Sequence, residues 1–464
     1  MVAARKIMPG NVLLCWAKSR SGLLSAIFWS GLGASAPALA QSGSPAGPVP
    51  VVRLKARRAA LLGRIGDGVA VLPSGKVKSI EGDYPQDSDY RESNDFFYLT
   101  GLELPGAFLV LSAGKSGPDQ EFLYIPARDT VSEKWTGPQL APAEAGRLSG
   151  ISVVRPVTRA AGEIAELVLG SSSPARRGAL YLPERQGGNN ELLQDLRLRW
   201  AAEKRPVRSR NLDPEIAALR LVKDADELSR LRRAIAITAE GINASMRSVR
   251  PGMWEYQLEA TIEYTFRSRG AERVGFPSIV ASGPNSVVLH YDTNRRQLEP
   301  GELVVEDVGA EFGYYSADLT RTIPVSGRFS PRQRALYELV RQTQQAAIDS
   351  VRPGVTLAGL NRIAREYMRD HSGDLCGRDS CVPYFIHGLS HWLGMDVHDV
   401  GVFGARLEPG MVLTVEPGIY LPDEKLGIRI EDDVLVTAQG SEVLSRAAPS
   451  TPEEIELAMS QHVP

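Results

Sequence analysis

Apolar and polar positions alternate in blocks along the first half of the chain. Short apolar runs bounded by glycine, proline or polar residues predict strands, and the amphipathic stretches between them predict helices. Residues 53–62 have helical spacing, and residues 69–72 form an apolar run of strand length. Strands that alternate with helices are typical of an α/β domain. Further strands are predicted at residues 97–99, 108–111, 122–125 and 179–182, and further helices at residues 142–148 and 190–200.

The pattern changes near residue 216, where long and highly charged helical stretches begin. Residues 224–246 and 254–269 predict two long helices. From residue 277 onward strand-like runs dominate, and helical stretches interrupt them at residues 331–351 and 357–370. The short, hairpin-like spacings of these runs predict a mainly antiparallel sheet. We therefore expect an α/β domain over residues 51–215 and an α+β domain over residues 216–464.

The first fifty residues follow neither pattern. Four basic residues precede an apolar run at residues 22–32, and small residues then lead to Ala38-Leu39-Ala40. These features predict a secretory signal peptide over residues 1–40, because the apolar run is shorter than the roughly 20 residues of a spanning helix. A buried N-terminal helix is the alternative, which the glycine and proline residues of this segment disfavour. Residues 41–50, rich in Gly, Ser and Pro, predict a linker.

Export affects the interpretation of the cysteines. The sequence predicts a periplasmic or secreted protein, and Cys15 lacks a lipid-attachment context, so we expect no membrane anchor. Cys376 and Cys381 lie five positions apart in a polar loop. An oxidising compartment favours a local disulfide between them, with two free thiols as the alternative.

Composition limits the classes of partner. The chain has 464 residues, of which 43% are hydrophobic and 23% charged, with a formal net charge of −2. This is ordinary globular composition without the basic field that gathers nucleic acid. We therefore expect small-molecule or peptide partners.

Two aspartates occupy related positions on a predicted hairpin. Asp307 and Asp318 lie at the inner ends of two strand-like runs, residues 303–305 and 319–323. In a hairpin they could face one another on the same side of the ladder. Carboxylates this close repel unless a proton or a cation lies between them, and a cation is favoured if further ligands converge.

Further ligand-type residues follow at strand ends. The strand at residues 411–415 leads into Glu416, and the period of two places Arg429 and Glu431 on one face of the next strand. Each residue alone is more often a turn residue, an ion pair or a core group. Together, four carboxylates and a histidine suit a pair of hard to borderline divalent ions. Four of the six histidines lie in this half of the chain: His290, His387, His391 and His398.

The candidate residues stand in several distinctive blocks of sequence. These are Asp307-Val308-Gly309-Ala310-Glu311, Asp318-Leu319-Thr320-Arg321-Thr322, His387-Gly388-Leu389-Ser390-His391-Trp392-Leu393-Gly394-Met395-Asp396-Val397-His398-Asp399-Val400-Gly401, Val415-Glu416-Pro417-Gly418, Gly427-Ile428-Arg429-Ile430-Glu431-Asp432-Asp433 and, upstream, Arg250-Pro251-Gly252-Met253, Leu289-His290-Tyr291 and Arg91-Glu92-Ser93-Asn94-Asp95-Phe96-Phe97-Tyr98-Leu99-Thr100-Gly101. Together they closely resemble aminopeptidase P (Xaa-Pro aminopeptidase), a family that shares the pita-bread fold with prolidase and methionine aminopeptidase. The likeness covers nearly everything after residue 50, and its order, spacing and ligand types make it highly specific.

The resemblance implies a pita-bread catalytic domain, with a curved and mainly antiparallel sheet, that holds two divalent metal ions. Asp318 and Glu431 would bridge the ions. Carboxylate-rich sites favour Mn²⁺, with Zn²⁺ and Co²⁺ as alternatives. A small departure is Glu306-Asp307-Val308, where the family usually has an apolar residue and Ala in place of Glu and Val. The implied metal ligands are Asp307, Asp318, His391, Glu416 and Glu431, and the other implied active-site residues are His290, His387, His398 and Arg429.

The implied activity is hydrolysis of the N-terminal Xaa-Pro bond of peptides. The hypothesis is that a hydroxide bridging the two ions attacks the amide carbonyl, while Glu416 relays the proton. His387 and His398 would donate to the developing oxyanion, and His290 would line the prolyl side. Relatives are often dimers or tetramers, so we expect a homo-oligomer.

Three alternatives accompany this hypothesis. Prolidase, which cleaves only Xaa-Pro dipeptides, typically has Gly-His-Phe in place of Ser390-His391-Trp392. Nucleophilic catalysis by Ser390 is disfavoured because no G-x-S-x-G elbow surrounds it. A catalytically inactive binding module should have lost ligands, and every matched position keeps its residue type.

Overall fold

The computed structural model describes residues 45–77, 90–113, 119–169, 179–185, 208–377, 380–402 and 404–461. The predicted signal peptide and the helix predicted at residues 190–200 lie outside these ranges. All the described residues belong to one compact unit. None of the described helices has the length and hydropathy needed to span a bilayer.

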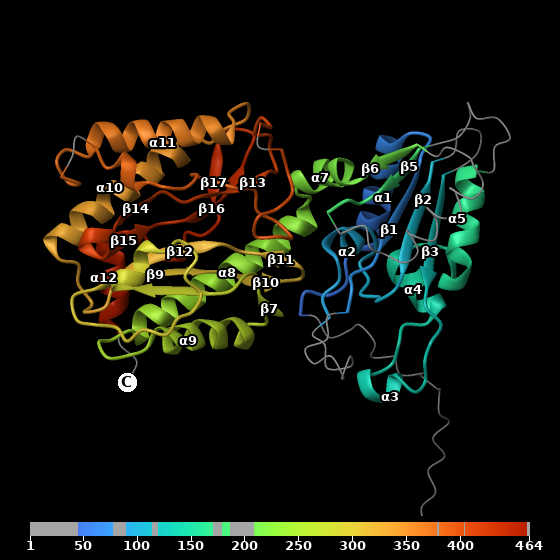
Figure 1. The fold of residues 1–464 in the computed structure, drawn as a ribbon, viewed down its shortest axis with the longest axis horizontal. Helices are drawn as coiled ribbons and strands as arrows, with labels where there is room; N and C mark the ends of the chain where they lie inside the picture. Colours follow the sequence, from blue (N-terminus) through green and yellow to red (C-terminus); the bar gives the residue numbers. More distant parts are fainter. Residues whose placement is uncertain are drawn as a thin grey trace, which may run out of the picture. The chain divides into compact units, whose positions relative to one another are not determined.

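The N-terminal domain contains a mixed sheet of six strands in the order β4-β3-β2-β1-β5-β6 (Figure 1). The β1–β2 and β2–β3 pairs are antiparallel, whereas β1–β5, β3–β4 and β5–β6 are parallel. The predictions of strands at residues 69–72, 108–111, 122–125 and 179–182 are confirmed. The strands are β1 (Val69–Pro73), β2 (Phe108–Ser112), β3 (Gln120–Ile125), β4 (Val153–Pro156), β5 (Leu180–Leu182) and β6 (Ser209–Asn211).

Helices cover both faces of this sheet, which explains why β1 is a continuous apolar run. Ala70 and Leu72 pack in one core cluster with the helices α1 (Val51–Ile65), α2 (Asn94–Thr100) and α4 (Pro142–Ser149). Val69 and Val71 pack in a second cluster with α5 (Ala160–Leu169). The domain also contains the short helix α3 (Glu133–Thr136).

The prediction of a strand at residues 97–99 is wrong, because these residues lie in α2. Ser93 accepts a hydrogen bond from the Phe96 amide at the start of this helix, and Gly101 ends it in the left-handed conformation. Three consecutive apolar residues do not distinguish a strand from a turn of buried helix. The capping residues on either side carry the information that the apolar run lacks.

The second half is an α+β domain. Its strand pairs are all antiparallel within the described residues. The sheets have the orders β11-β10-β7, β12-β9-β8, β13-β16-β17 and β14-β15. The strands are β7 (Arg273–Val274), β8 (Ile279–Ser282), β9 (Leu303–Val308), β10 (Ala310–Phe312), β11 (Tyr315–Ser316), β12 (Leu319–Pro324), β13 (Val412–Val415), β14 (Gly418–Leu421), β15 (Leu426–Arg429), β16 (Asp432–Val436) and β17 (Ser441–Val443).

Its helices begin at clear sequence signals. At α8 the Asp224 and Glu227 side chains form a capping box, and at α10 Ser330 and Gln333 do the same. The four long helices predicted from residue 224 onward are confirmed. The predicted domain boundary at residues 215–216 falls within α7. The helices are α7 (Asp213–Leu221), α8 (Ala225–Ser248), α9 (Glu255–Ser268), α10 (Pro331–Ile348), α11 (Leu357–His371) and α12 (Pro452–Ser460).

Two segments outside the helices and strands, the end of the predicted linker and the loop after α11, are held by specific contacts. Val49, near the end of the predicted linker, is buried, and the Gly47 carbonyl accepts a hydrogen bond from Arg230, so this part of the linker is packed. Cys376 and Cys381 form a disulfide after α11, which confirms the favoured prediction.

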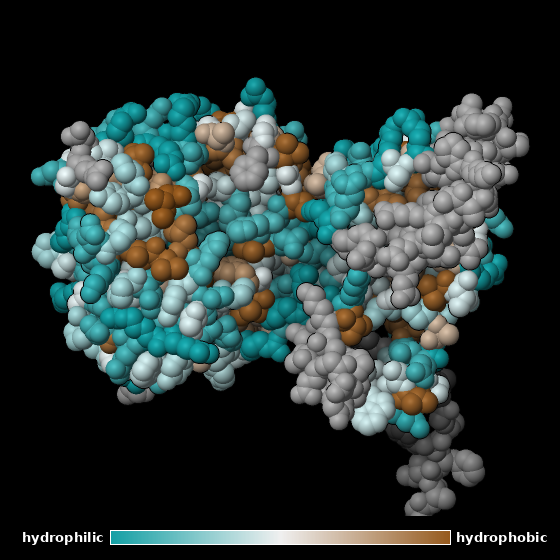
Figure 2. All heavy atoms as spheres, in the orientation of Figure 1, coloured by the Kyte–Doolittle hydropathy of each residue, from teal (hydrophilic) through white to brown (hydrophobic). Residues whose placement is uncertain are grey.

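On the face shown in Figure 2, hydrophilic residues predominate and the exposed hydrophobic residues form separate small patches.

Candidate metal centre

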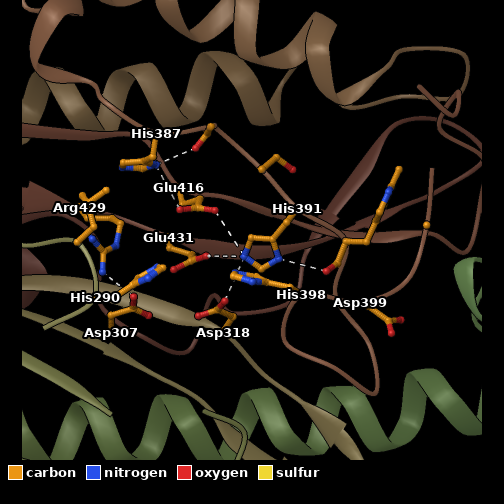
Figure 3. A pocket seen from close by; sticks show the side chains of 15 residues that line it. His290, Asp307, Asp318, His387, His391, His398, Asp399, Glu416, Arg429 and Glu431 are labelled. Carbon is orange, nitrogen blue, oxygen red and sulfur yellow. Dashed lines mark hydrogen bonds and ion pairs between the residues drawn. The ribbon is translucent and has the colours of Figure 1, made fainter. Parts of the chain in front are cut away.

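One cavity of about 480 Å³ in the C-terminal domain collects every site residue predicted from the sequence. Figure 3 shows the side chains converging on His391 from several strands and loops. The cavity wall also includes Ser390, Trp392 and Asp399, among others. The predicted residues that line it are His290, Asp307, Asp318, His387, His391, His398, Glu416, Arg429 and Glu431.

The hairpin formed by β9 and β12 presents the two aspartates. Asp307 lies on β9 opposite Thr320, and Asp318 lies two residues before Thr320. Asp307 and Asp318 are therefore diagonal neighbours on one face of the ladder, not directly opposed residues. The two aspartates lie on the same side of the ladder, as expected, but Asp318 is two positions away from the residue that pairs with Asp307. Both side chains are almost fully buried.

The two glutamates extend from neighbouring strand ends. Glu416 follows β13, and its amide donates to the Leu389 carbonyl. Glu431 lies between β15 and β16, and its amide donates to the Thr320 carbonyl. The Thr320 hydroxyl donates to Glu431 Oε2 at 2.7 Å. Thr320 therefore connects the Glu431 strand to the Asp307 hairpin.

His391 points one ring nitrogen at three carboxylates. Its Nε2 lies 3.3 Å from Asp318 Oδ2, 3.5 Å from Glu416 Oε1 and 3.9 Å from Glu431 Oε1. Its Nδ1 lies 3.1 Å from the Trp392 carbonyl oxygen, to which only a protonated Nδ1 can donate. In the neutral ring this leaves an Nε2 lone pair facing the carboxylates. That arrangement is typical of a metal-binding histidine whose second nitrogen is held by a carbonyl.

The concentrated negative charge of the buried carboxylates favours the binding of a cation. Burial, together with repulsion from Asp307, Asp433 and Glu416, raises the pKa of Asp318 well above its usual range. Burial, and then Asp318 and Glu416, does the same to the pKa of Glu431. Clustered buried carboxylates are costly unless protonated or bound to cations.

The donor set fits divalent metal ions. Within the described residues, Asp307 Oδ1 and Asp318 Oδ1 are buried and have no hydrogen-bond donor. Ligand atoms of Asp318, His391 and Glu431 lie within 4.8 Å of one another. Carboxylate oxygens with one imidazole nitrogen suit Mn²⁺, Zn²⁺ or Co²⁺. The residues present therefore match the chemistry that the sequence predicted.

Arg429 and Tyr420 form a hydrogen-bonded group next to the carboxylates. Arg429 Nη2 donates to Asp307 Oδ2 at 2.5 Å, and Nη1 donates to the Tyr420 hydroxyl at 2.9 Å. The Tyr420 hydroxyl also lies 2.8 Å from His387 Nε2. Sequence reasoning missed Tyr420, which lies on β14. The available signal was its place in a strand-like run, two residues after Pro417-Gly418.

His387 is a neutral ring with both nitrogens engaged. Burial, and then the nearby Arg429 charge, lowers the pKa of His387 to about 4. Its Nδ1 lies 2.8 Å from the Gly388 carbonyl, so Nδ1 donates and Nε2 accepts from Tyr420. The ring of His398, in contrast, lies 4.3 Å from that of His391 and is exposed to the cavity. Burial, then His391 and His290, lowers the pKa of His398.

Two residues near the centre have other surroundings. Glu306, the departure noted in the sequence, is fully buried away from the cavity and accepts a hydrogen bond from Ser245. Burial raises the pKa of Glu306 to about 8. Within the described residues the Ser390 hydroxyl has no hydrogen-bond partner, so no base activates it as a nucleophile.

Comparisons with known proteins agree with this geometry. The family model for metallopeptidase family M24 matches residues 229–438, and that for the aminopeptidase P N-terminal domain matches residues 54–174. The Xaa-Pro aminopeptidase of Escherichia coli K12 is 34% identical over 433 residues, which cover 87% of this chain and 96% of the relative.

Solved structures of aminopeptidases P resemble this chain over most of its length. Proline aminopeptidase P II from Yersinia pestis matches with a TM-score of 0.80 at 32% identity, over 89% of this chain and 100% of that one. Aminopeptidase P from E. coli with the inhibitor Pro-Leu matches with a TM-score of 0.81 at 31% identity, over 89% and 99%. The α/β N-terminal domain is thus followed by a pita-bread domain. The chain belongs to the aminopeptidase P (Xaa-Pro aminopeptidase) family of M24 metallopeptidases.

Proposed function

We propose that this protein is a metallo-aminopeptidase that hydrolyses the N-terminal Xaa-Pro bond of peptides. The observation that carries the proposal is the convergence of four buried carboxylates and His391 in one cavity of an M24 metallopeptidase. Relatives that match most of the chain are named Xaa-Pro aminopeptidases, and similar solved structures are aminopeptidases P. Both findings favour this activity over that of a prolidase.

We assign Asp307, Asp318, His391, Glu416 and Glu431 as the ligands of two divalent ions. The carboxylate-rich donor set favours Mn²⁺, with Zn²⁺ and Co²⁺ as alternatives. One solved structure of the E. coli enzyme is of its Zn-substituted form in complex with product. When bound, the ions would lower the pKa of a water molecule and offset the charge that develops on the carbonyl oxygen.

Glu416 is the proposed proton carrier. It takes a proton from the attacking water and delivers it to the proline nitrogen, which leaves as the C–N bond breaks. Glu416 suits this role because its carboxylate faces the cavity, where its Oε1 lies 3.5 Å from His391 Nε2. Burial raises the pKa of Glu416 above its usual value in the absence of metal.

His398 is the proposed donor to the carbonyl oxygen. Its ring is exposed to the cavity beside His391, so a hydrogen bond from it can strengthen as negative charge develops. The sequence predicted that His387 would also donate to this oxygen. Because both of its nitrogens are engaged, we propose instead that His387 holds Tyr420 and shapes the prolyl side together with His290. Arg429 compensates the charge of Asp307.

Three peptides test the proposed activity. The metal-loaded protein should release the first residue from Xaa-Pro-Xaa, act poorly on the dipeptide Xaa-Pro, and leave N-acetyl-Xaa-Pro-Xaa intact because its amine is blocked. Preferential cleavage of the dipeptide would replace the proposal with prolidase activity. Failure to cleave any of the three, with metal bound, would favour the binding module.

We further propose export and a homo-oligomeric state, either a dimer or a tetramer. The composition of the leader supports export, and so does the Cys376–Cys381 disulfide, which is favoured in oxidising compartments. N-terminal sequencing of the mature protein should begin at Gln41. Light scattering should give a mass of two or four chains.

A further inference from the structure

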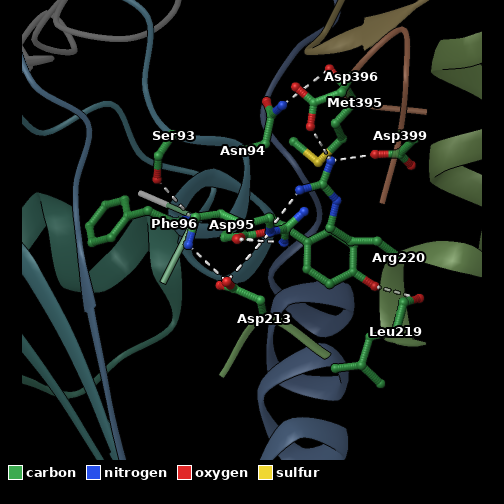
Figure 4. A network of polar contacts seen from close by, with 12 residues as sticks. Ser93, Asn94, Asp95, Phe96, Asp213, Leu219, Arg220, Met395, Asp396 and Asp399 are labelled. Carbon is green, nitrogen blue, oxygen red and sulfur yellow. Dashed lines mark hydrogen bonds and ion pairs between the residues drawn. The ribbon is translucent and has the colours of Figure 1, made fainter. Parts of the chain in front are cut away.

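A buried arginine lies beside the catalytic cavity. Arg220, in the last turn of α7, is 2% exposed. Its guanidinium donates to Asp95 Oδ1 at 2.7 Å, Asp399 Oδ1 at 2.5 Å and Asp396 Oδ2 at 3.0 Å (Figure 4). A guanidinium this deeply buried persists only when carboxylates compensate its charge. Arg220 thus ties three segments together that are far apart in sequence.

Asp399, one residue after His398, fixes the histidine-bearing loop from both sides. Its side chain binds Arg220 and also accepts from Lys223 Nζ at 3.3 Å. Its amide donates to the Trp392 carbonyl at 2.8 Å, the same carbonyl that His391 Nδ1 approaches. The loop that begins at His391 and ends at His398 is therefore closed at Asp399.

The loop packs closely around Asp399 and Trp392. A Cβ atom on Gly394 would collide with Asp399 Oδ2, and one on Gly401 would collide with the Trp392 ring. Because Asp399 directly follows His398 in the chain, we expect a displacement of Asp399 to shift the His398 backbone and with it the ring.

The N-terminal domain reaches the same loop from outside. Asp95, on α2, is 4% exposed and binds Arg220. Asn94 and Arg91 each donate to the Met395 carbonyl, in the middle of the loop, at 3.3 Å. Residues of the block at 91–101 therefore contact the loop that carries His391 and His398, directly and through Arg220.

We propose that Arg220 is a positioning residue for His398, and that the N-terminal domain supports the catalytic centre through Asp95. This inference rests on the proposed function, in which His398 donates to the carbonyl oxygen of the substrate. Arg220 is not among the residues that line the cavity. It acts by holding Asp399, and through Asp399 the orientation of the His398 ring.

A double-mutant cycle with His398→Ala tests the inference. In the metal-loaded enzyme acting on Xaa-Pro-Xaa, Arg220→Met should lower kcat by roughly 10–100-fold, while KM changes by less than about threefold. In the His398→Ala background the same substitution should lower kcat by no more than about threefold, because the group it positions is gone. Arg220→Lys, which keeps the charge, should retain more of kcat than Arg220→Met.

A matched control separates positioning from general destabilisation. Arg57 is also a buried arginine that joins the two domains, through Asp224 and Glu227, but it does not contact the loop. Arg57→Met should lower the thermal midpoint without coupling to His398→Ala. The milder Asp95→Asn keeps the Arg220–Asp399 pair and is the test if Arg220→Met does not fold. Metal content, measured for every variant, should stay at the wild-type value.

The outcomes are distinct. Losses of equal size in both backgrounds, for Arg220→Met or for Asp95→Asn, would overturn the positioning role while the proposed function stands. Loss of metal from Arg220→Met or Asp95→Asn would also overturn it, because the effect would then pass through the ligands. A metal-loaded wild type that does not cleave Xaa-Pro-Xaa would overturn the proposed function, and the inference with it.

Discussion

The four carboxylates of the centre have different surroundings, and we infer a different role for each from these surroundings. Asp307 is paired with Arg429, whereas the pKa values of Asp318 and Glu431 are raised by burial and by neighbouring carboxylates. Among the described residues, Asp318 and Glu431 form no ion pair with an Arg or Lys side chain, which makes them the best candidates for bridging ligands. Glu416 faces the cavity and lies beside His391, as a proton carrier must.

Replacing Glu416 with Gln should separate metal binding from proton transfer. The amide oxygen of Glu416→Gln can still bind a metal ion but cannot accept a proton, so kcat should fall by roughly 10²–10⁴-fold with metal content retained. Steady-state kinetics and metal analysis of the same sample measure both quantities. Glu424→Gln, which replaces an exposed carboxylate paired with Arg332, is the control and should behave as wild type. Retained turnover would remove Glu416 from the base role.

Asp399 should make stability depend on acid. Burial alone would raise the pKa of Asp399, but Arg220 and Lys223 outweigh it and hold the pKa below the ordinary value. A carboxylate with a depressed folded-state pKa stabilises the fold above its unfolded value of about 4, and the contribution is lost as pH falls through the folded pKa. Asp399→Asn should therefore destabilise the protein by roughly 3 kcal/mol at neutral pH. The difference from wild type should narrow below about pH 4. Unfolding experiments from pH 7 to pH 3 measure this, and a difference independent of pH would contradict it.

At the scale of elements, strand ends deliver the ligands, and this much could be predicted. The hydrophobic period of two placed Arg429 and Glu431 on one face, and the run before Glu416 had strand length. All three positions line the cavity. The register of the β9–β12 hairpin could not be read from the sequence, because the intervening β10 and β11 strands decide how Asp307 aligns.

Contacts distant in sequence explain what the pattern did not reveal. Arg220 binds partners 125 and 179 positions away, and no local periodicity encodes such pairs. The role of Tyr420 depends on Arg429 and His387, whose side chains the fold places against its hydroxyl. The segment at residues 97–99 was predicted wrongly because its helix is defined by capping residues outside the apolar run.

The disulfide is an element-scale feature that can be tested alone. Cys376 and Cys381 close a short loop between α11 and the segment that carries His387. The double variant Cys376→Ser/Cys381→Ser should lose about 2 kcal/mol of unfolding free energy. Its kcat should stay within a factor of about three, because the metal ligands are untouched. Denaturant unfolding with and without a reducing agent measures this. The reductant should affect only the wild type, and an equal effect on both proteins would contradict the prediction.

At the scale of the whole molecule, the fold buries a cluster of negative charge that the described cationic side chains compensate only in part. Arg429 pairs with Asp307, while burial and neighbouring carboxylates raise the pKa values of Asp318 and Glu431. Ions that bind only the folded state stabilise it by mass action, so metal binding and folding are linked. The thermal midpoint should therefore rise with the concentration of the bound metal.

The central claim is that five side chains between Asp307 and Glu431 hold a pair of catalytic cations, and metal stripping tests it most directly. Metal analysis of the active protein should find two divalent ions per chain. Chelation should abolish cleavage of Xaa-Pro-Xaa and lower the thermal midpoint, and two equivalents of Mn²⁺ should restore both. Asp318→Asn should not be restored. A fully stripped protein that cleaves the peptide as fast as the metal-loaded one would contradict the account.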